Sequence, residues 1–257
     1  MIDMNTVTDE QADYMNTPME AVEEIDMLWD TLSARLAMTA EFAIRFHEWQ
    51  KTHKSFVATG SDYAKVEEQL PPSVIKSFTG VYCSMGNVLK SNGETVYQKD
   101  FAPSEELLSL LEKYRAETEY PGPLFDNYIE RRIGMVNFSV LGRDCLYTER
   151  ERYCAWDKVA HERLKIQAEL KRAFPDLDIA VGGSISMDIT PKGCGKGQVA
   201  HHLRATYPGE EIVFFGDKTF KGGNDYELAQ ELATLSATKT VQVDDPDFVL
   251  KYLEENT

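Results

Sequence analysis

Four consecutive apolar residues, Ile212 to Phe215, end at Gly216 and are followed directly by Asp217. A short continuous apolar run with this ending is typical of a buried parallel strand, which needs helices on both faces of its sheet. In open α/β sheets, ligands bind outside the carboxyl ends of the strands. The run therefore predicts an α/β fold and places Asp217 at the sheet edge where a ligand would bind.

A second carboxylate stands close to Asp217 in the sequence. Asp225 follows the flexible turn Gly222-Gly223, and a lysine and a threonine lie between the two acids. Carboxylates bind hard cations such as Mg²⁺, and a lysine complements a phosphate. An ordinary polar turn after a strand is the alternative, but the density of polar residues here favours a functional site.

Charge and cysteine usage exclude several classes of function. The net charge is −16, whereas nucleic-acid binding needs clustered Lys and Arg, so we expect no nucleic-acid partner. The four cysteines have no CxxC spacing and therefore suggest neither a zinc site nor a redox motif. No apolar run has the length of a membrane span, and no basic residue precedes Arg35. We expect a cytoplasmic protein with free thiols and no membrane association.

The amino-terminal part of the chain carries a strand, a glycine turn and a helix start. Residues 55–58 predict a short strand and residues 63–70 a helix, with Asp62 placed to cap its amino end. The turn at residues 59–61 would present backbone amides and the helix dipole to an anion. Residues 1–24 are acidic and weakly patterned, and we interpret them as an extension.

A middle segment shows the alternation of half-buried strands instead. Apolar and polar side chains alternate in residues 134–141 and 181–190, and helical patterns cover residues 104–116 and 155–174. This combination predicts an antiparallel sheet with helices on one face. The polar face of that sheet would be free to line a cleft.

The chain thus divides into two predicted domains. Its length of 257 residues fits one large domain or two modest ones. We expect an α/β core formed by residues 1–90 and 193–257. An α+β domain, residues 91–192, would be inserted into this core.

The inserted domain holds the residues best suited to bind a phosphorylated ligand. Five arginines gather around its first long strand, and arginine can grip phosphate with two hydrogen bonds. They are Arg131, Arg132, Arg143, Arg150 and Arg152. For any single arginine a solvated charged face is the alternative. Ser186 and Asp188 share one strand face and suit sugar hydroxyls, while Lys196 precedes a helix of the core and could neutralise a phosphate there.

With these pieces in order, the chain resembles the eukaryotic-type phosphomannomutases of the haloacid dehalogenase (HAD) superfamily. The similarity covers roughly residues 30–235 and is carried by four motifs in the same order. These are residues 60–70 (GSDYAKVEEQL), 132–143 (RIGMVNFSVLGR), 182–188 (GGSISMD) and 214–227 (FFGDKTFKGGNDYE). The resemblance implies a HAD-like Rossmannoid core with a parallel sheet and a cap that binds the phosphosugar. It also implies a homodimer through the cap, for which residues 104–116 are a candidate surface.

The resemblance further implies a reaction and the residues that perform it. The family moves phosphate between positions 6 and 1 of mannose through an aspartyl-phosphate, with Mg²⁺ as cofactor, and supplies the precursor of GDP-mannose. Asp217 and Asp225 match the metal-binding acids, Lys196 the lysine beside the phosphoaspartate, and, more loosely, Glu231 and Thr234 a second metal loop. The substrate-binding residues would be Arg35, Thr59, Ser61, Arg132, Arg143, Arg150, Ser186 and Asp188.

The first motif of the family, Asp-x-Asp-Gly-Thr, has no counterpart here. Counting back from the Gly60 turn places Thr31 at the motif's threonine and Asp30 at its glycine, or at its second aspartate if the glycine is deleted. The nucleophile position then falls on Met27 or Leu28, or on Asp26 after a local insertion. A rival placement is residues 3–6 at the amino terminus. Asp26 and Asp30 are therefore the catalytic candidates. A second departure from the family pattern is Met85, which stands where the family has asparagine.

Three functions are consistent with these residues. The first is a phosphomannomutase, an isomerase. The second is a sugar phosphatase of the same superfamily, since Thr59 is the residue type usual in those enzymes. The third is a catalytically impaired phosphosugar-binding protein that has lost the chemistry of its first strand and kept the cleft.

Overall fold

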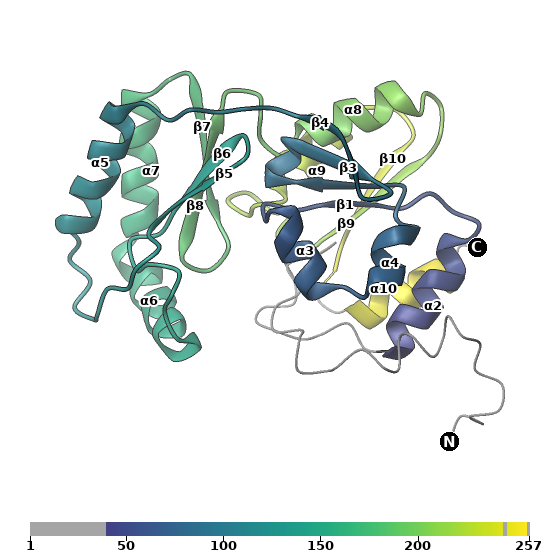
Figure 1. Cartoon of the computed structure of the whole chain (residues 1–257), viewed down its shortest axis with the longest axis horizontal. Coiled ribbons are helices and arrows are strands. Elements are labelled where there is room, and N and C mark those ends of the chain that lie inside the picture. Colours follow the sequence, from purple (N-terminus) through teal and green to yellow (C-terminus); the bar gives the residue numbers. More distant parts are fainter. Residues whose placement is uncertain (1–39, 244–245, 256–257) are drawn as a thin grey trace.

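The structure is a computed structural model that describes residues 40–243 and 246–255. Figure 1 shows two lobes joined by extended segments, a core and a cap. The helices are α2 (Ala40–Gln50), α3 (Tyr63–Gln69), α4 (Pro72–Ser77), η3 (Ser84–Gly86), α5 (Glu105–Ala116), α6 (Tyr147–Ala160), α7 (Glu162–Ala173), α8 (Gln198–Thr206), α9 (Tyr226–Ala233) and α10 (Pro246–Glu255). The strands are β1 (Phe56–Ala58), β2 (Gly80–Cys83), β3 (Val88–Ser91), β4 (Glu94–Gln98), β5 (Ile129–Arg132), β6 (Met135–Phe138), β7 (Leu177–Gly182), β8 (Ser186–Pro191), β9 (Ile212–Gly216) and β10 (Thr238–Gln242).

The core contains two separate sets of paired strands among the described residues. β1 pairs in parallel with β2, which continues through the antiparallel strands β3 and β4, and β9 pairs in parallel with β10. One apolar cluster joins these strands to α2, α4 and α10, and a second joins them to α8 and α9. The predicted strand before Asp217 is confirmed as β9, with helices on both faces as expected.

The cap is one antiparallel sheet, in the order β5-β6-β8-β7. α5, α6 and α7 cover one face of this sheet (Figure 1), and Phe138, Met187 and Ile189 are completely buried beneath them. Polar side chains of β6 and β8, among them Asn137 and Asp188, are buried as well. The predicted fold class, an α/β core with an inserted α+β cap, is confirmed. No helix of residues 40–243 and 246–255 is long and apolar enough to cross a membrane.

Three predicted elements differ from the structure. The single strand expected at residues 181–190 is a hairpin of β7 and β8, in which Gly183 has a φ of +52°. The single helix expected at residues 155–174 is divided at His161, whose left-handed backbone ends α6 and precedes α7. β4 lies in the core sheet, so the division expected at residue 91 moves to the end of that strand.

Gly142 of the cap offers a direct test of backbone packing. Its φ is +89°, and a Cβ at this position would lie 2.1 Å from the carbonyl oxygen of Phe125. Gly93 has a similar φ of +79° but nothing within 4 Å of the same position. We expect Gly142→Ala to cost about 3 kcal/mol, because the peptide must move as well as adopt a strained φ, and Gly93→Ala only about 1 kcal/mol. Urea unfolding measures both, and equal losses would contradict this packing.

Candidate active site

The cap and the core meet at the turn after β1. Arg132 of β5 donates from Nη1 to the carbonyl oxygen of Gly60 at 2.7 Å. A Cβ at Gly60 would lie 3.4 Å from Oδ2 of Asp188 in β8. The polar side of the cap sheet therefore faces this turn directly, and a ligand held by one lobe would contact the other.

A hydrogen-bonded network fills the polar side of the cap sheet. Arg143 donates from Nη1 to Asn137 Oδ1 and to Ser186 Oγ, both at 3.2 Å. Asn137 in turn donates to Asp188 Oδ1 at 2.8 Å. Glu130 accepts from Arg132 and lies 3.2 Å from Nε of Arg143. The network fixes the orientation of both predicted sugar contacts and of two predicted phosphate-binding arginines.

The electrostatics of this network favour an anionic ligand. Burial lowers the pKa of Arg143, and the neighbouring charges of Arg132 and Arg150 lower it further, while Glu130 opposes the shift. Guanidinium groups crowded together in this way gain most from a dianion such as a phosphate, which offsets their mutual repulsion. Three of the five predicted arginines are thus brought together. The other two are exposed: Arg131 on the outside of β5, and Arg152 in an ion pair with Glu149.

The core half of the site contains a buried ion pair. Lys196 Nζ lies 2.8 Å from Asp225 Oδ1, and each side chain is only 4% exposed. Asp225 is the first residue before α9, and a Cβ at Gly216 would lie 2.9 Å from its Oδ2. Asp217, also buried, follows Gly216 at the end of β9. The three predicted core residues therefore gather where β9 ends.

The turn that faces the cap is held by its own backbone. Thr59 Oγ1 accepts from the amide of Ser61 at 3.1 Å, and the carbonyl oxygens of these two residues accept from Met85 and Ser84. Asp62 caps α3 by accepting from Lys65, as predicted. Met85 packs over the turn, with its sulfur 3.3 Å from a Cβ at Gly60. The turn is a rigid, buried wall of the site.

The donors at the end of β9 fit a magnesium ion. Asp217 and Asp225 supply carboxylate oxygens, and Oδ1 of Asn224 is buried with no hydrogen-bond partner among the described residues. Hard oxygen donors of this kind are the ligands Mg²⁺ prefers. No three His, Cys, Asp or Glu side chains converge in the described part of the chain, so other oxygens, such as those of a phosphate or of solvent, would complete the coordination.

Two residues predicted for a second metal loop are engaged elsewhere. Glu231 Oε2 lies 2.9 Å from Nε2 of His201, on the exposed side of α9. Thr234 donates to the carbonyl oxygen of Glu231 at 2.7 Å, at the end of the same helix. Their role in metal binding stays a prediction. Asp26, Asp30 and Arg35 lie outside the described residues.

Sequence reasoning missed four residues that shape the site. Glu130 and Asn137 belong to the cap network, and Asn224 lies beside Asp225. Glu227 accepts from the backbone amides of Lys196 and Gly197, and burial raises its pKa. Asn137 carried a usable signal, because it lies on the polar side of its predicted strand. Glu227 carried none, because its contacts are with a segment 30 residues earlier in the chain.

Solved structures of HAD-like hydrolases share this fold. A haloacid dehalogenase-like hydrolase from Bacteroides thetaiotaomicron aligns with a TM-score of 0.54 and 13% identity, over 89% of this chain and 98% of that one. The C-terminal domain of the trehalose-6-phosphate phosphatase of C. albicans aligns with a TM-score of 0.57 and 14% identity, over 84% and 83%. At such low identity, these likenesses establish the fold alone.

Sequence comparison identifies the family. The phosphomannomutase of Dendrobium officinale is 36% identical over 219 residues, which cover 82% of this chain and 85% of that protein. The phosphomannomutase of Spinacia oleracea is 35% identical over 234 residues, or 86% and 93% of the two chains. A sequence model of the eukaryotic phosphomannomutases matches residues 43–255. The chain belongs to the eukaryotic phosphomannomutase family.

Proposed function

We propose that this protein is a magnesium-dependent phosphomannomutase that interconverts mannose 6-phosphate and mannose 1-phosphate. The observation that carries the proposal is the buried network of Arg143, Asn137, Ser186 and Asp188, held against the core turn at Gly60. It combines a phosphate-binding arginine with hydroxyl-binding groups on one rigid face. Family membership and the relatives' names support the same activity.

In this proposal the two lobes bind the two ends of the sugar. The cap arginines hold the phosphate that is not transferred, and Ser186 and Asp188 orient the hydroxyls. In a sugar bisphosphate intermediate, a core aspartate attacks the other phosphorus: its carboxylate oxygen forms a bond to phosphorus as the phosphorus–sugar oxygen bond breaks. In the opposite direction, the free hydroxyl of a bound sugar monophosphate attacks the phosphorus of the aspartyl-phosphate, and the bond from phosphorus to the aspartate oxygen breaks. A second acid protonates the leaving sugar oxygen and later removes a proton from the accepting hydroxyl. Asp26 and Asp30 are the candidates for these two roles.

The core residues offset the charge on the transferring group. Mg²⁺, held by Asp217, Asp225 and Asn224, would neutralise charge on the phosphoryl oxygens. Lys196 is placed by its contact with Asp225 to do the same from the side of α8. Glu227 positions Lys196 by holding the backbone around it. Because these groups are fixed before the substrate binds, they need little reorganisation during the reaction.

The wider role follows from the product. Mannose 1-phosphate is the precursor of GDP-mannose, so we place the enzyme in the cytoplasm upstream of GDP-mannose synthesis. A homodimer through the cap remains part of the proposal. Leu107 and Leu111 of α5 are buried within the cap, so the outward side of that helix would form the contact. Light scattering on the purified protein measures its mass in solution and so tests whether it is a dimer.

The decisive assay follows mannose 1-phosphate in the presence of Mg²⁺ and a hexose bisphosphate activator. Formation of mannose 6-phosphate without loss of phosphate supports the proposal. Release of inorganic phosphate without isomerisation would instead identify a sugar phosphatase. A folded protein that produces neither, under conditions in which a related mutase is active, would overturn both enzymatic functions.

One observation favours a second candidate, a phosphosugar-binding protein without turnover. The segment at residues 25–31 reads IDMLWDT in place of the family's Asp-x-Asp-Gly-Thr. The cap network does not depend on that segment. Calorimetric binding of mannose 1-phosphate, combined with the absence of any turnover, would select this function.

Arg143 provides a test of the cap. We expect Arg143→Ala to weaken mannose 1-phosphate binding by about 30- to 1000-fold, because losing one partner of a buried charged contact costs about 2–4 kcal/mol. Arg131→Ala is the matched control, since it removes an exposed arginine from the same domain and should change binding less than about threefold. Calorimetry measures both variants. Similar losses would show that the cap acts by general charge rather than through this network.

A further inference from the structure

Both connections between the lobes, and one hairpin of the cap, converge on a single residue of the core. Asn87, which lies just before β3, is completely buried. Its carbonyl oxygen accepts from the amide of Lys99 at 2.8 Å, where the chain leaves the core after β4. Its side chain donates from Nδ2 to the carbonyl oxygen of Cys194 at 3.0 Å, where the chain returns after β8. A Cβ at Gly134, in the turn between β5 and β6, would lie 2.4 Å from the Cβ of Asn87.

Gln198, the first residue of α8, binds the same two connections. Its Nε2 lies within hydrogen-bond distance of the carbonyl oxygens of Met85 and Cys194, both at 2.9 Å, and of Oδ1 of Asn87 at 3.2 Å. Its Oε1 accepts from Nζ of Lys99. Asn87 and Gln198 thus hold the outgoing and the returning connection together, and we call these two residues with their contacts to Lys99 and Cys194 the joint.

A strained turn links the joint to the wall of the site. Ser84, Met85 and Gly86 all have positive φ, at 50°, 62° and 87°. Two consecutive non-glycine residues in the left-handed region are unfavourable, so this conformation persists only where the surrounding structure imposes it. The carbonyl oxygens of Ser84 and Met85 accept from the side chains of Asn87 and Gln198, at 2.8 and 2.9 Å. The joint therefore helps to impose the strained turn.

On its other side, the strained turn holds the part of the core that faces the cap. It donates two backbone amides, at 2.8 and 2.9 Å, to carbonyl oxygens of residues 59–61. Arg132 of the cap donates to the carbonyl oxygen of Gly60 in the same segment. Arg132 also lies two residues before Gly134, which packs on Asn87. Asn87 is thus connected to both partners of the contact between the cap and the core.

We propose that Asn87 is a positioning residue that fixes the cap over the core turn at Gly60, with Gln198 as its partner in the joint. Its effect on turnover rests on the proposed function. A phosphosugar held by the cap must present its phosphorus to the core, and a displacement of about 1 Å can slow such a reaction about 100-fold. The joint itself does not depend on that function.

Asn87→Leu removes the polar contacts of the side chain and keeps its approximate shape. The backbone of Asn87 has φ −77° and ψ −13°, which leucine adopts as well. No contacting carbonyl is left unpaired, because that of Cys194 still accepts from Gln198 and that of Ser84 from the amide of residue 87. We therefore expect a folded protein whose Tm is lowered by no more than about 8 °C.

The kinetic effect of Asn87→Leu should fall on turnover rather than on binding. We expect kcat for mannose 1-phosphate to decrease about 10- to 100-fold, while the affinity measured by calorimetry changes by less than about threefold. The proposed cap contacts are unchanged in this variant, but the cap no longer holds the sugar in a fixed position over the core.

Hydrogen exchange measures the joint without using turnover. In Asn87→Leu, the amides of Lys99 and Cys194, one in each connection, should exchange at least about 10-fold faster than in the unaltered protein, because the connections open more often. Unchanged exchange of both amides would overturn the proposal whatever the activity. An unchanged kcat, in a protein that is an active mutase, would overturn it as well.

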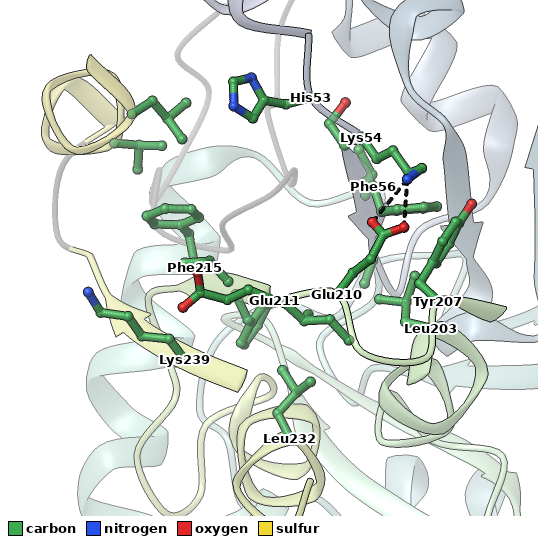
Figure 2. A pocket seen from close by; sticks show the side chains of 18 of the residues that line it. His53, Lys54, Phe56, Leu203, Tyr207, Glu210, Glu211, Phe215, Leu232 and Lys239 are labelled. Atoms are coloured by element: carbon green, nitrogen blue, oxygen red, sulfur yellow. Dashed lines mark hydrogen bonds and ion pairs between the residues drawn. The ribbon is translucent and has the colours of Figure 1, made fainter. Parts of the chain in front are cut away.

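Two control variants remove contacts of the core that do not involve the joint. Gln50→Leu replaces a buried amide that donates to Ser55 at 2.8 Å, just before β1. Lys54→Met removes the ion pair with Glu210, which also joins distant segments of the chain (Figure 2). Both should leave kcat and the exchange of the two connections within about threefold of the unaltered protein. Losses as large as those of Asn87→Leu would overturn the proposal.

A double variant tests whether Asn87 and Gln198 act as one unit. Gln198→Leu should change kcat and exchange in the same direction as Asn87→Leu. The double variant should lower kcat by no more than about threefold beyond the larger single effect, because both residues act through one joint. Single effects that multiply in full would overturn the proposal. If the unaltered protein has no mutase activity, the proposed function fails, and the exchange measurement alone decides for or against the joint.

Discussion

Replacing Asp217 with asparagine should lower kcat for mannose 1-phosphate about 1000-fold or more, with little change in substrate affinity. The carboxylate is buried at the end of β9 and belongs to the oxygen donors that fit Mg²⁺. A neutral amide binds the ion less tightly and offsets less charge on the phosphoryl group. A loss of about 4 kcal/mol of transition-state stabilisation corresponds to this factor. Substrate affinity should survive, because the proposed sugar contacts are in the cap.

The control for this variant is Asp157→Asn. Asp157 is also buried, and it pairs with Arg163 at 2.7 Å inside the cap, away from β9. Its loss should destabilise the protein while leaving kcat within about threefold. The Mg²⁺ concentration needed for half-maximal activity should rise for Asp217→Asn alone. A similar fall of kcat in both variants would mean that Asp217 acts through stability, and a normal kcat in Asp217→Asn would remove it from the reaction.

Sequence pattern alone was enough for the elements whose signals are local. The apolar run before Asp217, the capping residue Asp62 and the helix after Gly197 each depend on a few neighbouring residues, and each is found where it was expected. The cap arginines were also predictable as a group, because clustered arginines stand out in a chain with a net charge of −16. Clustering alone did not separate the three that converge from Arg131 and Arg152, whereas the family resemblance implied Arg132, Arg143 and Arg150.

The missed features depend on distant contacts or on single backbone angles. The alternation of apolar and polar residues over 181–190 continues through Gly183. This pattern therefore gave no indication that the chain turns there and forms a hairpin of two strands. His161 adopts a left-handed conformation with a φ of 55°. Glycine is the residue that usually indicates such a conformation, so a histidine gave no signal for the break in the helix. Glu227 reaches the backbone beside Lys196 only after folding.

Replacing Lys196 with methionine should lower the free energy of unfolding by about 3–5 kcal/mol. Both members of its ion pair with Asp225 are only 4% exposed, so the substitution leaves a buried carboxylate without this partner. For a chain of this size, the loss corresponds to a Tm decrease of about 6–15 °C. Lys54→Met is the matched control: its pair with Glu210 has the same 2.8 Å distance but is about half exposed. It should cost no more than about 1 kcal/mol.

A double variant separates the structural role of Lys196 from its catalytic one. Adding Asp225→Asn to Lys196→Met removes the stranded charge, so stability should recover by about 2 kcal/mol or more relative to the single variant. Activity should not recover, because in the proposed function Lys196 is the cation that faces the phosphoryl group and Asp225 is one of the carboxylates that bind the metal, and both are lost. Chemical unfolding and kcat, measured on the same preparations, would show this divergence. If activity returned together with stability, Lys196 would be a structural residue and the charge on the phosphoryl group would have to be offset by other groups.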